Sequence, residues 1–241
     1  MPRRDDSDAE DDEVPSSSSS SSSGAVGNSG GRTLIVILDL ASLETVKTRK
    51  GDFQLLNCDD HISLMRKHNK DPQQYRPDII HQELMAVLDS PLNKEGKVKL
   101  YVHTEKNVLI EINPKTRLPR TYKRFSGLMV QLLHRLKIRS SDGNDVLLKV
   151  IKNPMSRHLP AGARCIGFSH TGTLYSPASL AANLPDDVPV VFVFGAMATG
   201  AIKMADHPYM QEMVSISEYP LSGVVAVNRV LGAVENHWGV V

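Results

Sequence analysis

Apolar residues fall into short continuous runs that are separated by polar, bend-prone segments. Thr33–Leu40 reads TLIVILDL and Val190–Phe194 reads VVFVF, and in neither run do apolar and polar positions alternate. Such runs are typical of strands buried on both faces, as in a parallel sheet with helices packed above and below. Val146–Ile151 and Cys165–Phe168 are runs of a similar kind, so strands are expected there as well.

Other segments repeat their apolar residues at helical spacing. Asp78–Leu88 and Ser222–His237 predict helices, and Lys97–His103 and Asn107–Asn113 predict the two strands of a hairpin. The clearest amphipathic helix is Phe125–Lys137, whose apolar face holds Leu128, Met129, Leu132, Leu133 and Leu136. Because helices alternate with strands through the second half of the chain, the pattern predicts an α/β fold with a parallel sheet.

Near the C-terminus an apolar strand runs twice into a loop of small, bend-prone residues. The first copy is Val188–Gly200 (VPVVFVFGAMATG) and the second is Met213–Gly223 (MVSISEYPLSG). Loops at the carboxyl ends of parallel strands are where α/β proteins bind ligands. Gly195 and Gly200 leave backbone N–H and C=O groups open to such a ligand. The simpler alternative is a pair of ordinary strand-to-helix turns, but two adjacent loops favour a cofactor site.

Several common ligand sites do not fit the sequence. The chain has no G-x-G-x-x-G string, and Ala201-Ile202 stand where a phosphate-binding P-loop beginning at Gly195 would need Lys and Ser or Thr. An NTPase is therefore not expected. Cys58 and Cys165 have no paired spacing, and the nine histidines form no ligand cluster, so no metal site is expected.

The first 31 residues differ in composition from the rest. They contain the acidic cluster Asp5–Glu13, the serine run Ser16–Ser23 and the small residues of Gly24–Gly31. Such a segment buries too little apolar surface to fold, so we expect a disordered tail at 1–31 and one domain at 32–241. Without the tail the chain has 26 basic and 20 acidic side chains, a net charge of +6 that allows a polyanionic partner. No apolar run is long enough to span a membrane, and no membrane partner is expected.

A basic segment precedes the amphipathic helix. Asn113–Phe125 reads NPKTRLPRTYKRF, and its two prolines predict an exposed loop carrying Arg117 and Arg120, with Arg124 in the first turn of the helix. Positive charge at a helix N-terminus is unfavourable unless an anion lies nearby. The two aromatic residues of the segment offer stacking surface, as in proteins that bind single-stranded RNA. The alternative is a solvated loop with no partner.

Arg76-Pro77-Asp78 forms a second charged motif. Asp78 can pair with Arg76 across the proline and hold the guanidinium in one orientation for bidentate contact with a phosphate. Alternatively, Asp78 caps the helix that follows it, and the two roles are compatible.

Five strings together resemble one known family. They are RPDIIHQ (Arg76–Gln82), LDSPLNKEG (Leu88–Gly96), KNVLIEINPKTRLPRTYKRFSGLMVQLLH (Lys106–His134), LLKVIKNP (Leu147–Pro154) and SISEYPLS (Ser215–Ser222). From about Arg32 to Val241 the chain resembles the SPOUT-class small-subunit rRNA pseudouridine N1-methyltransferases, known as the nucleolar essential protein or essential for mitotic growth family. The acidic, serine-rich extension indicates a eukaryotic member.

The resemblance implies a parallel SPOUT sheet with a C-terminal trefoil knot, an S-adenosylmethionine pocket formed by the knot, and a homodimer that buries the C-terminal helix. It assigns cofactor contacts to Phe168, Gly195, Gly200, Ile216, Ser217, Glu218, Tyr219, Pro220 and Leu221. It assigns rRNA contacts to Arg76, Arg117, Arg120 and Arg124, with Asp78 orienting Arg76. The chain departs from the usual family spelling at Thr199, at Glu218 and over Ile202–Gln211, which affects the expected rim of the pocket.

The activity implied is methylation of N1 of a pseudouridine in small-subunit rRNA, with a role in small-subunit biogenesis in the nucleus and nucleolus. Other small-subunit assembly factors are expected partners, and no catalytic base can be named from the residues. Two alternatives stay open. One is an rRNA-binding assembly factor whose cofactor pocket is not catalytic, and the other is methylation at a ribose 2′-hydroxyl.

Overall fold

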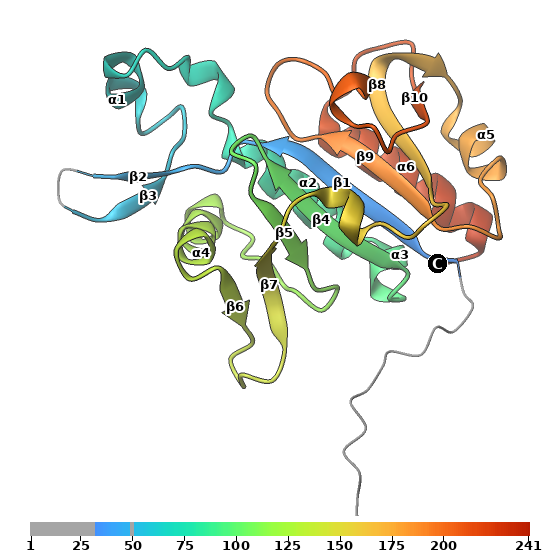
Figure 1. The fold of residues 1–241 in the computed structure, drawn as a ribbon, viewed down its shortest axis with the longest axis horizontal. Helices are drawn as coiled ribbons and strands as arrows, with labels where there is room; N and C mark the ends of the chain where they lie inside the picture. Colours follow the sequence, from blue (N-terminus) through green and yellow to red (C-terminus); the bar gives the residue numbers. More distant parts are fainter. Residues whose placement is uncertain (1–31, 49–50) are drawn as a thin grey trace, which may run out of the picture. The chain divides into compact units, whose positions relative to one another are not determined.

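The computed structural model describes residues 32–48 and 51–241, and the tail predicted at 1–31 lies outside these residues. Eight strands form one sheet in the order β10-β8-β9-β1-β4-β5-β7-β6 (Figure 1). Their bounds are β1 (Leu34–Ala41), β4 (Val98–Thr104), β5 (Leu109–Ile112), β6 (Lys137–Arg139), β7 (Val146–Ile151), β8 (Arg164–Leu174), β9 (Val190–Gly195) and β10 (Glu212–Ser215).

Helices and a small hairpin complete the fold. The longer helices are α2 (Pro77–Asp89), α4 (Tyr122–Arg135) and α6 (Gly223–Trp238). The shorter elements are β2 (Thr45–Lys47), β3 (Phe53–Leu55), α1 (Ile62–Lys67), α3 (Pro91–Lys94), α5 (Pro177–Ala182) and the 3-10 turns η1 (Pro72–Gln74), η2 (Met155–His158) and η3 (Met204–Asp206). Across the described ranges, no helix has the length and apolar character needed to cross a membrane.

The sheet has a parallel half and an antiparallel half. Strands β10, β8, β9, β1 and β4 pair in parallel, whereas β4, β5, β7 and β6 pair antiparallel. The parallel sheet expected from the second half of the chain is therefore confirmed, and the hairpin expected after Lys97 is the β4–β5 pair. The extension of this hairpin by β7 and β6 was not expected, because β6 is only three residues long and has no clear pattern of its own.

Both faces of the sheet are covered. Leu34, Val36 and Leu38 of β1 pack in the core cluster that also holds buried residues of α2, α4 and α6. Ile35 and Ile37 point to the opposite face, where η2 and the loops after β7 and β9 form a second cluster. Figure 1 shows η2 crossing this face, with α2 and α6 on the other. This double burial explains why β1 and β9 have no polar alternation.

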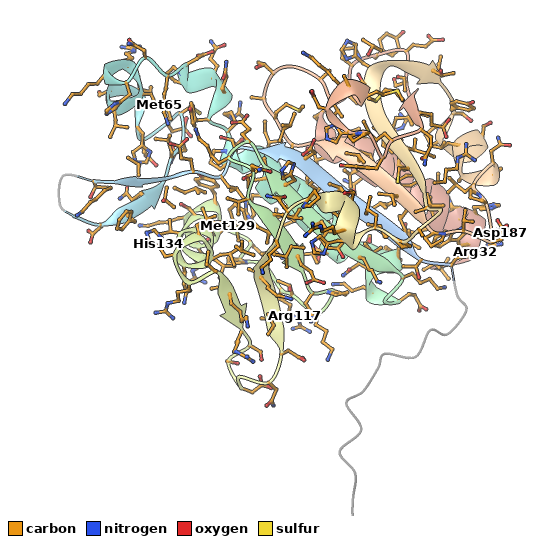
Figure 2. The ribbon with its side chains drawn as sticks, viewed as in Figure 1. Arg32, Met65, Arg117, Met129, His134 and Asp187 are labelled. Atoms are coloured by element: carbon orange, nitrogen blue, oxygen red, sulfur yellow. The ribbon has the colours of Figure 1, made fainter. Side chains whose placement is uncertain are left out.

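Both predicted ends of one helix are wrong. The helix expected at Phe125–Lys137 begins at Tyr122 and ends at Arg135. Leu136 has a left-handed backbone (φ 61°) and is 54% exposed, so it does not belong to the apolar face. The chain turns here because Lys137–Arg139 leaves the helix to pair with β7 as strand β6. The last turn of α4 instead packs toward the β2–β3 hairpin, where His134 (labelled in Figure 2) lies 4.3 Å from the ring of Phe53.

A buried carboxyl lies where α2 meets α6. Glu83 of α2 is fully buried, and neither carboxyl oxygen has a hydrogen-bond partner among the described residues. A Cβ on Gly223 would collide with Oε1 of Glu83, so any larger residue at the start of α6 would displace this carboxyl group. Burial in an apolar contact disfavours the ionised form and raises the pKa of Glu83 to about 8.

Glu83→Gln should stabilise the fold increasingly as the pH rises. An unfolded glutamate ionises near about 4.3, whereas the pKa of the folded carboxyl is about 8. Between these values folding takes up a proton, so the wild type loses stability with rising pH, while Gln is neutral throughout. The difference in Tm should be near zero at pH about 4 and greatest above pH about 8. Thermal unfolding of Glu95→Gln, which alters an exposed side chain, is the control. Identical pH profiles for wild type and Glu83→Gln would contradict a buried neutral carboxyl.

Candidate functional site

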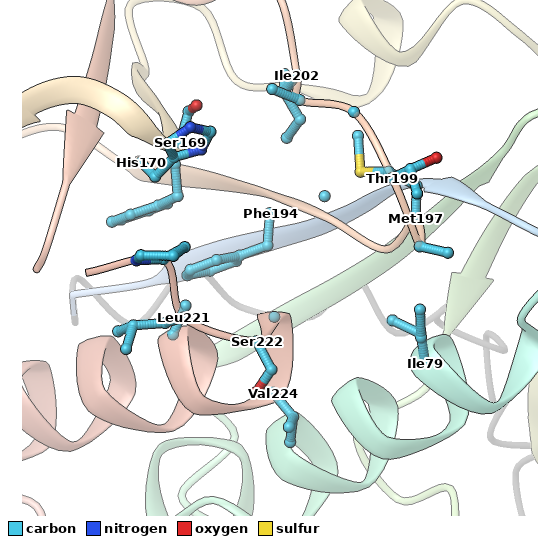
Figure 3. A pocket seen from close by; sticks show the side chains of 18 of the residues that line it. Ile79, Ser169, His170, Phe194, Met197, Thr199, Ile202, Leu221, Ser222 and Val224 are labelled. Carbon is cyan, nitrogen blue, oxygen red and sulfur yellow. The ribbon is translucent and has the colours of Figure 1, made fainter. Parts of the chain in front are cut away.

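A cavity of about 550 Å³ opens at the carboxyl end of the parallel strands. Its walls are the end of β9, the loop after β9, the segment from β10 into α6, part of β8 and the first turn of α2. In Figure 3 Ile202 lies on one side of the cavity, and Leu221, Ser222 and Val224 lie on the other. The two strand–loop units predicted from the sequence therefore face each other across a single pocket.

Stacked aromatic rings form the floor of the cavity. The rings of Phe168 and Phe194 are nearly parallel, with centroids 4.3 Å apart and an interplanar angle of 6°. Phe192 meets Phe168 edge-on at 5.2 Å. All three side chains are buried in the same core cluster, so the apolar floor that Phe168 and Phe194 provide is held in place by packing on one face of β9. Such a floor suits a ligand with a flat or apolar part.

The two loops present backbone groups to the cavity. Gly200 has φ +100°, a conformation that side-chain-bearing residues rarely adopt, and space around its α-carbon is open. In the second loop the Ser215 hydroxyl donates to the carbonyl of Ser217 (2.8 Å), and the Ser217 hydroxyl accepts from the backbone N–H of Tyr219 (3.0 Å). These local bonds hold the turn before α6 in one shape. Polar ligand atoms can therefore be recognised by main-chain groups in fixed positions.

Most residues predicted to contact a cofactor lie together. Eight line the cavity, and they are Phe168, Gly195, Gly200, Ile216, Ser217, Tyr219, Pro220 and Leu221. Glu218 is exposed and is not part of the lining. The sequence interpretation missed other lining residues, among them Ile79, Met197 and Val224. Met197 lies between the two glycines of the first loop, so the sequence could have indicated it, whereas Ile79 reaches the cavity only through the packing of α2.

Arg76 and Asp78 form a fork at the edge of the same cavity. Arg76 Nε donates to Oδ1 of Asp78 at 2.8 Å, and Nη2 donates to Oδ2 at 2.6 Å. This pairing lowers the pKa of Asp78 and raises that of Arg76. The predicted pairing is therefore confirmed, but the predicted cap is not. Helix α2 begins at Pro77, so Asp78 lies within its first turn, and Arg76 occupies the N-cap position without a side-chain cap.

The basic loop is held by hydrogen bonds from three other elements. The ring Nε2 of His81 in α2 lies 2.9 Å from the carbonyl oxygen of Pro119, and the Asn93 amide donates to the carbonyl of Pro114 at 3.0 Å. The Thr116 hydroxyl donates to the carbonyl of Leu147 in β7 at 2.9 Å. The loop is therefore a shaped surface and not a free coil.

The three arginines of this region lie outside the cavity and point to solvent. Arg117, Arg120 and Arg124 are exposed, and Arg120 pairs with Asp89 at the end of α2 (2.5 Å). The prediction that Phe125 offers an exposed stacking surface is wrong. This ring is fully buried and stacks on His81 with centroids 4.3 Å apart, because the first turn of α4 docks on α2.

The site has no features of a metal centre within residues 32–48 and 51–241. No group of three or more His, Cys, Asp or Glu side chains in these ranges is arranged to hold an ion.

Known proteins share this architecture and sequence. Residues 36–235 match the family model described as EMG1/NEP1 methyltransferase. The chain is 51% identical over 212 residues to the ribosomal RNA small subunit methyltransferase NEP1 of Mus musculus, covering 88% of this chain and 84% of that protein. It is 50% identical over 212 residues to the Homo sapiens protein of the same name, and this match also covers 88% of this chain and 84% of that protein.

A solved structure has the same fold. The crystal structure of Archaeoglobus fulgidus Nep1 bound to S-adenosylhomocysteine matches with a TM-score of 0.72 and 26% sequence identity. The match covers 87% of this chain and 99% of that chain. Because the family model and the close relatives both extend over nearly all of the described chain, the protein belongs to the EMG1/NEP1 methyltransferase family.

Proposed function

We propose that this chain transfers the methyl group of S-adenosylmethionine to N1 of a pseudouridine in small-subunit rRNA. The observation that carries the proposal is the single cavity between the two strand–loop units, in a chain of this methyltransferase family. The Archaeoglobus fulgidus relative was solved with S-adenosylhomocysteine, the product that remains when S-adenosylmethionine has given up its methyl group.

The residues present fit such a cofactor. The aromatic floor of Phe168 and Phe194 suits the apolar parts of the molecule, and the loops at Gly195–Gly200 and Ile216–Leu221 offer backbone groups to its polar edges. The volume of about 550 Å³ lies in the range of small-molecule sites. The bound cofactor supplies an activated methyl group on a sulfonium.

The protein contributes mainly by positioning the reactants. Pseudouridine carries a free N1–H because its ribose is bonded through carbon. N1 would give up this proton to water and accept the methyl group in line. The cofactor, held by the loops at Gly195–Gly200 and Ile216–Leu221, would supply this methyl group from its sulfonium and leave as the neutral thioether. Holding the base and methyl group in this geometry in a water-poor pocket can supply much of the rate enhancement. The target base must leave its stack to enter, which favours a loop nucleotide as substrate.

The basic surface fits the RNA half of the reaction. Arg117 and Arg120 project from a loop that is fixed to α2 and β7, and Arg124 lies in the first turn of α4. Arg76 lies at the edge of the cavity. We assign these four arginines to the rRNA and Asp78 to the orientation of Arg76. The two guanidinium groups with carboxylate partners, Arg76 and Arg120, are held in defined directions before RNA arrives.

Finer features of the family complete the proposal. The segment from β8 to α6 is assigned the trefoil knot of the SPOUT class, and α6 is assigned to a homodimer interface. An exposed apolar side chain on α6, Val225 at 41%, supports the latter. Nuclear and nucleolar localisation, and contacts with other small-subunit assembly factors, belong to the same proposal.

Methyl transfer to matched RNA hairpins tests the reaction. With S-adenosylmethionine carrying a labelled methyl group, the wild type should modify a hairpin that contains pseudouridine and leave the same hairpin with uridine unmodified. Ala198→Trp should abolish transfer, because Ala198 lines the cavity and the indole would fill it. Binding of the hairpin should be largely retained, since three of the four arginines assigned to the rRNA lie outside the cavity.

Three results would contradict the proposal. Equal methylation of both hairpins, located by mass spectrometry on the ribose, would indicate a 2′-hydroxyl methyltransferase. Failure of the folded wild type to bind S-adenosylmethionine in calorimetry would favour an assembly factor with a non-catalytic pocket. Full activity of a folded Ala198→Trp variant would place the cofactor elsewhere.

Replacing Arg117, Arg120 and Arg124 should weaken RNA binding and reduce its dependence on salt concentration. Each Arg→Ala change at positions 117, 120 and 124 should cost about 1–2 kcal/mol of binding free energy. It should also flatten the log–log salt slope by about 0.7 if each side chain neutralises one phosphate. Affinity for S-adenosylmethionine should not change. Arg32→Ala, which lies well away from Arg117 in Figure 2, is the control. An unchanged slope in the triple variant would mean that the loop faces solvent in the complex.

A double-mutant cycle should reveal the orienting role of Asp78. Removal of a negative charge near an RNA surface would by itself strengthen binding, whereas loss of the fork frees the Arg76 side chain and raises the entropy cost of binding. We therefore expect Asp78→Asn to weaken binding, and little further loss when it is added to Arg76→Ala. Asp187→Asn, at an exposed position beside Arg32, controls for the change in charge. Additive losses would show that the two residues act independently.

A further inference from the structure

One buried aspartate is bonded to both ends of a loop that lines the cavity. The loop, residues 196–207, is called the pocket loop here, and residues 197–202 line the cavity. At its start the N–H of Ala196 donates to the backbone carbonyl of Asp39 at 2.7 Å. At its end Nε2 of His207 lies 2.5 Å from Oδ2 of Asp39. The same residue of β1 therefore closes the loop at both ends.

The geometry of His207 specifies its protonation state. One ring nitrogen faces a carboxylate oxygen of Asp39, and the other, Nδ1, lies 3.1 Å from the carbonyl oxygen of Lys203. Both partners can only accept hydrogen bonds, so both ring nitrogens must carry a proton to satisfy them. Only the imidazolium form does this. His207 is buried, so water cannot replace a lost partner.

The other carboxyl oxygen of Asp39 contacts a second histidine. Nδ1 of His103 in β4 lies 2.7 Å from Oδ1, and its Nε2 lies 2.9 Å from the side-chain oxygen of Asn107. Asp39 is 1% exposed, and a buried carboxylate is tolerated only when it is fully paired. The cluster therefore joins β1, β4 and the end of the pocket loop.

We propose that Asp39 and His207 form a protonation-dependent clasp that holds the pocket loop in the shape that binds the cofactor. This rests on the proposed function in taking S-adenosylmethionine as the ligand. Neither residue lines the cavity, so both are positioning residues and not catalytic ones. A loop ordered before the ligand arrives spares the binding step the cost of ordering it. Loss of the clasp should therefore weaken cofactor binding without removing a contact.

The direction of the pH effect follows from the groups around His207. The bond to Asp39 raises the pKa of His207, although burial opposes this, and the carboxyl of Asp206 contributes in the same direction. Burial alone would raise the pKa of Asp39, but the two histidines outweigh it and lower the value to about 2. Tyr209 packs edge-on against His207, and burial raises its pKa, so it stays neutral. The clasp is complete at low pH and is lost as the pH rises through the folded pKa of His207.

Calorimetric titration with S-adenosylhomocysteine from pH about 6 to about 9 tests the clasp. Wild-type affinity should fall with rising pH, by roughly tenfold across the range. His207→Gln keeps one N–H donor but carries no charge, so its affinity should be low and should fall less with rising pH than that of the wild type. The remaining fall comes from His103, which stays bonded to Asp39, and from the ligand itself. Asp39→Asn should behave like His207→Gln. His68→Gln, at the exposed C-terminal end of α1, should retain the wild-type profile.

A second measurement separates this proposal from the proposed function. Hydrogen exchange of residues 197–206, corrected for intrinsic pH dependence, should rise with pH in the wild type and be high at every pH in His207→Gln. This holds whether or not the protein binds the ligand. If the wild type binds no S-adenosylhomocysteine but shows this exchange pattern, the clasp stands and the proposed cofactor fails. If His207→Gln lowers Tm yet keeps the wild-type affinity and pH profile, the clasp is overturned. Identical exchange in the two proteins would overturn it as well.

Discussion

The parallel pairing of β1 with both of its neighbours is the constraint on which the site depends. β1 is hydrogen-bonded to β4 on one edge and to β9 on the other, and its side chains are buried on both faces. In this register Leu38 lies opposite Phe194, and Asp39 lies opposite Gly195. The strand that organises the core therefore also sets where the glycine loop begins. A ligand site at the carboxyl ends of parallel strands follows from this arrangement.

Helix α2 joins the two halves of the site. Its N-terminal end brings Arg76 and Asp78 to the edge of the cavity, while His81 one turn later holds the carbonyl of Pro119 in the basic loop. Glu83 follows on the face that packs against Gly223 at the start of α6. A single rigid helix thus fixes the cavity wall and the basic loop relative to each other. Substrate positioning to within an ångström depends on this kind of support.

Much of the fold could be predicted from the sequence because its strands are buried on both faces. The apolar runs at Thr33–Leu40 and Val190–Phe194 are β1 and β9, and both strand–loop units lie at one cavity. The end of α4 could not be predicted, since Leu136 has the right spacing for a buried position. Only the pairing of β6 with β7 draws the chain out of the helix there. Phe125 was likewise indistinguishable from an exposed stacking residue until α2 covered it.

The sequence by itself determined the family, the two strand–loop units and the Arg76–Asp78 pair, because these are local patterns of residue type and spacing. Tertiary structure alone decided which distant side chains meet. Asp39, His103 and His207 lie far apart along the chain and carry no shared motif, yet the sheet brings them to one carboxylate. The same holds for Glu83 and Gly223, whose contact depends on how closely two helices pack. Pairing across the sheet and between helices is set by the whole core, which no short stretch of sequence encodes.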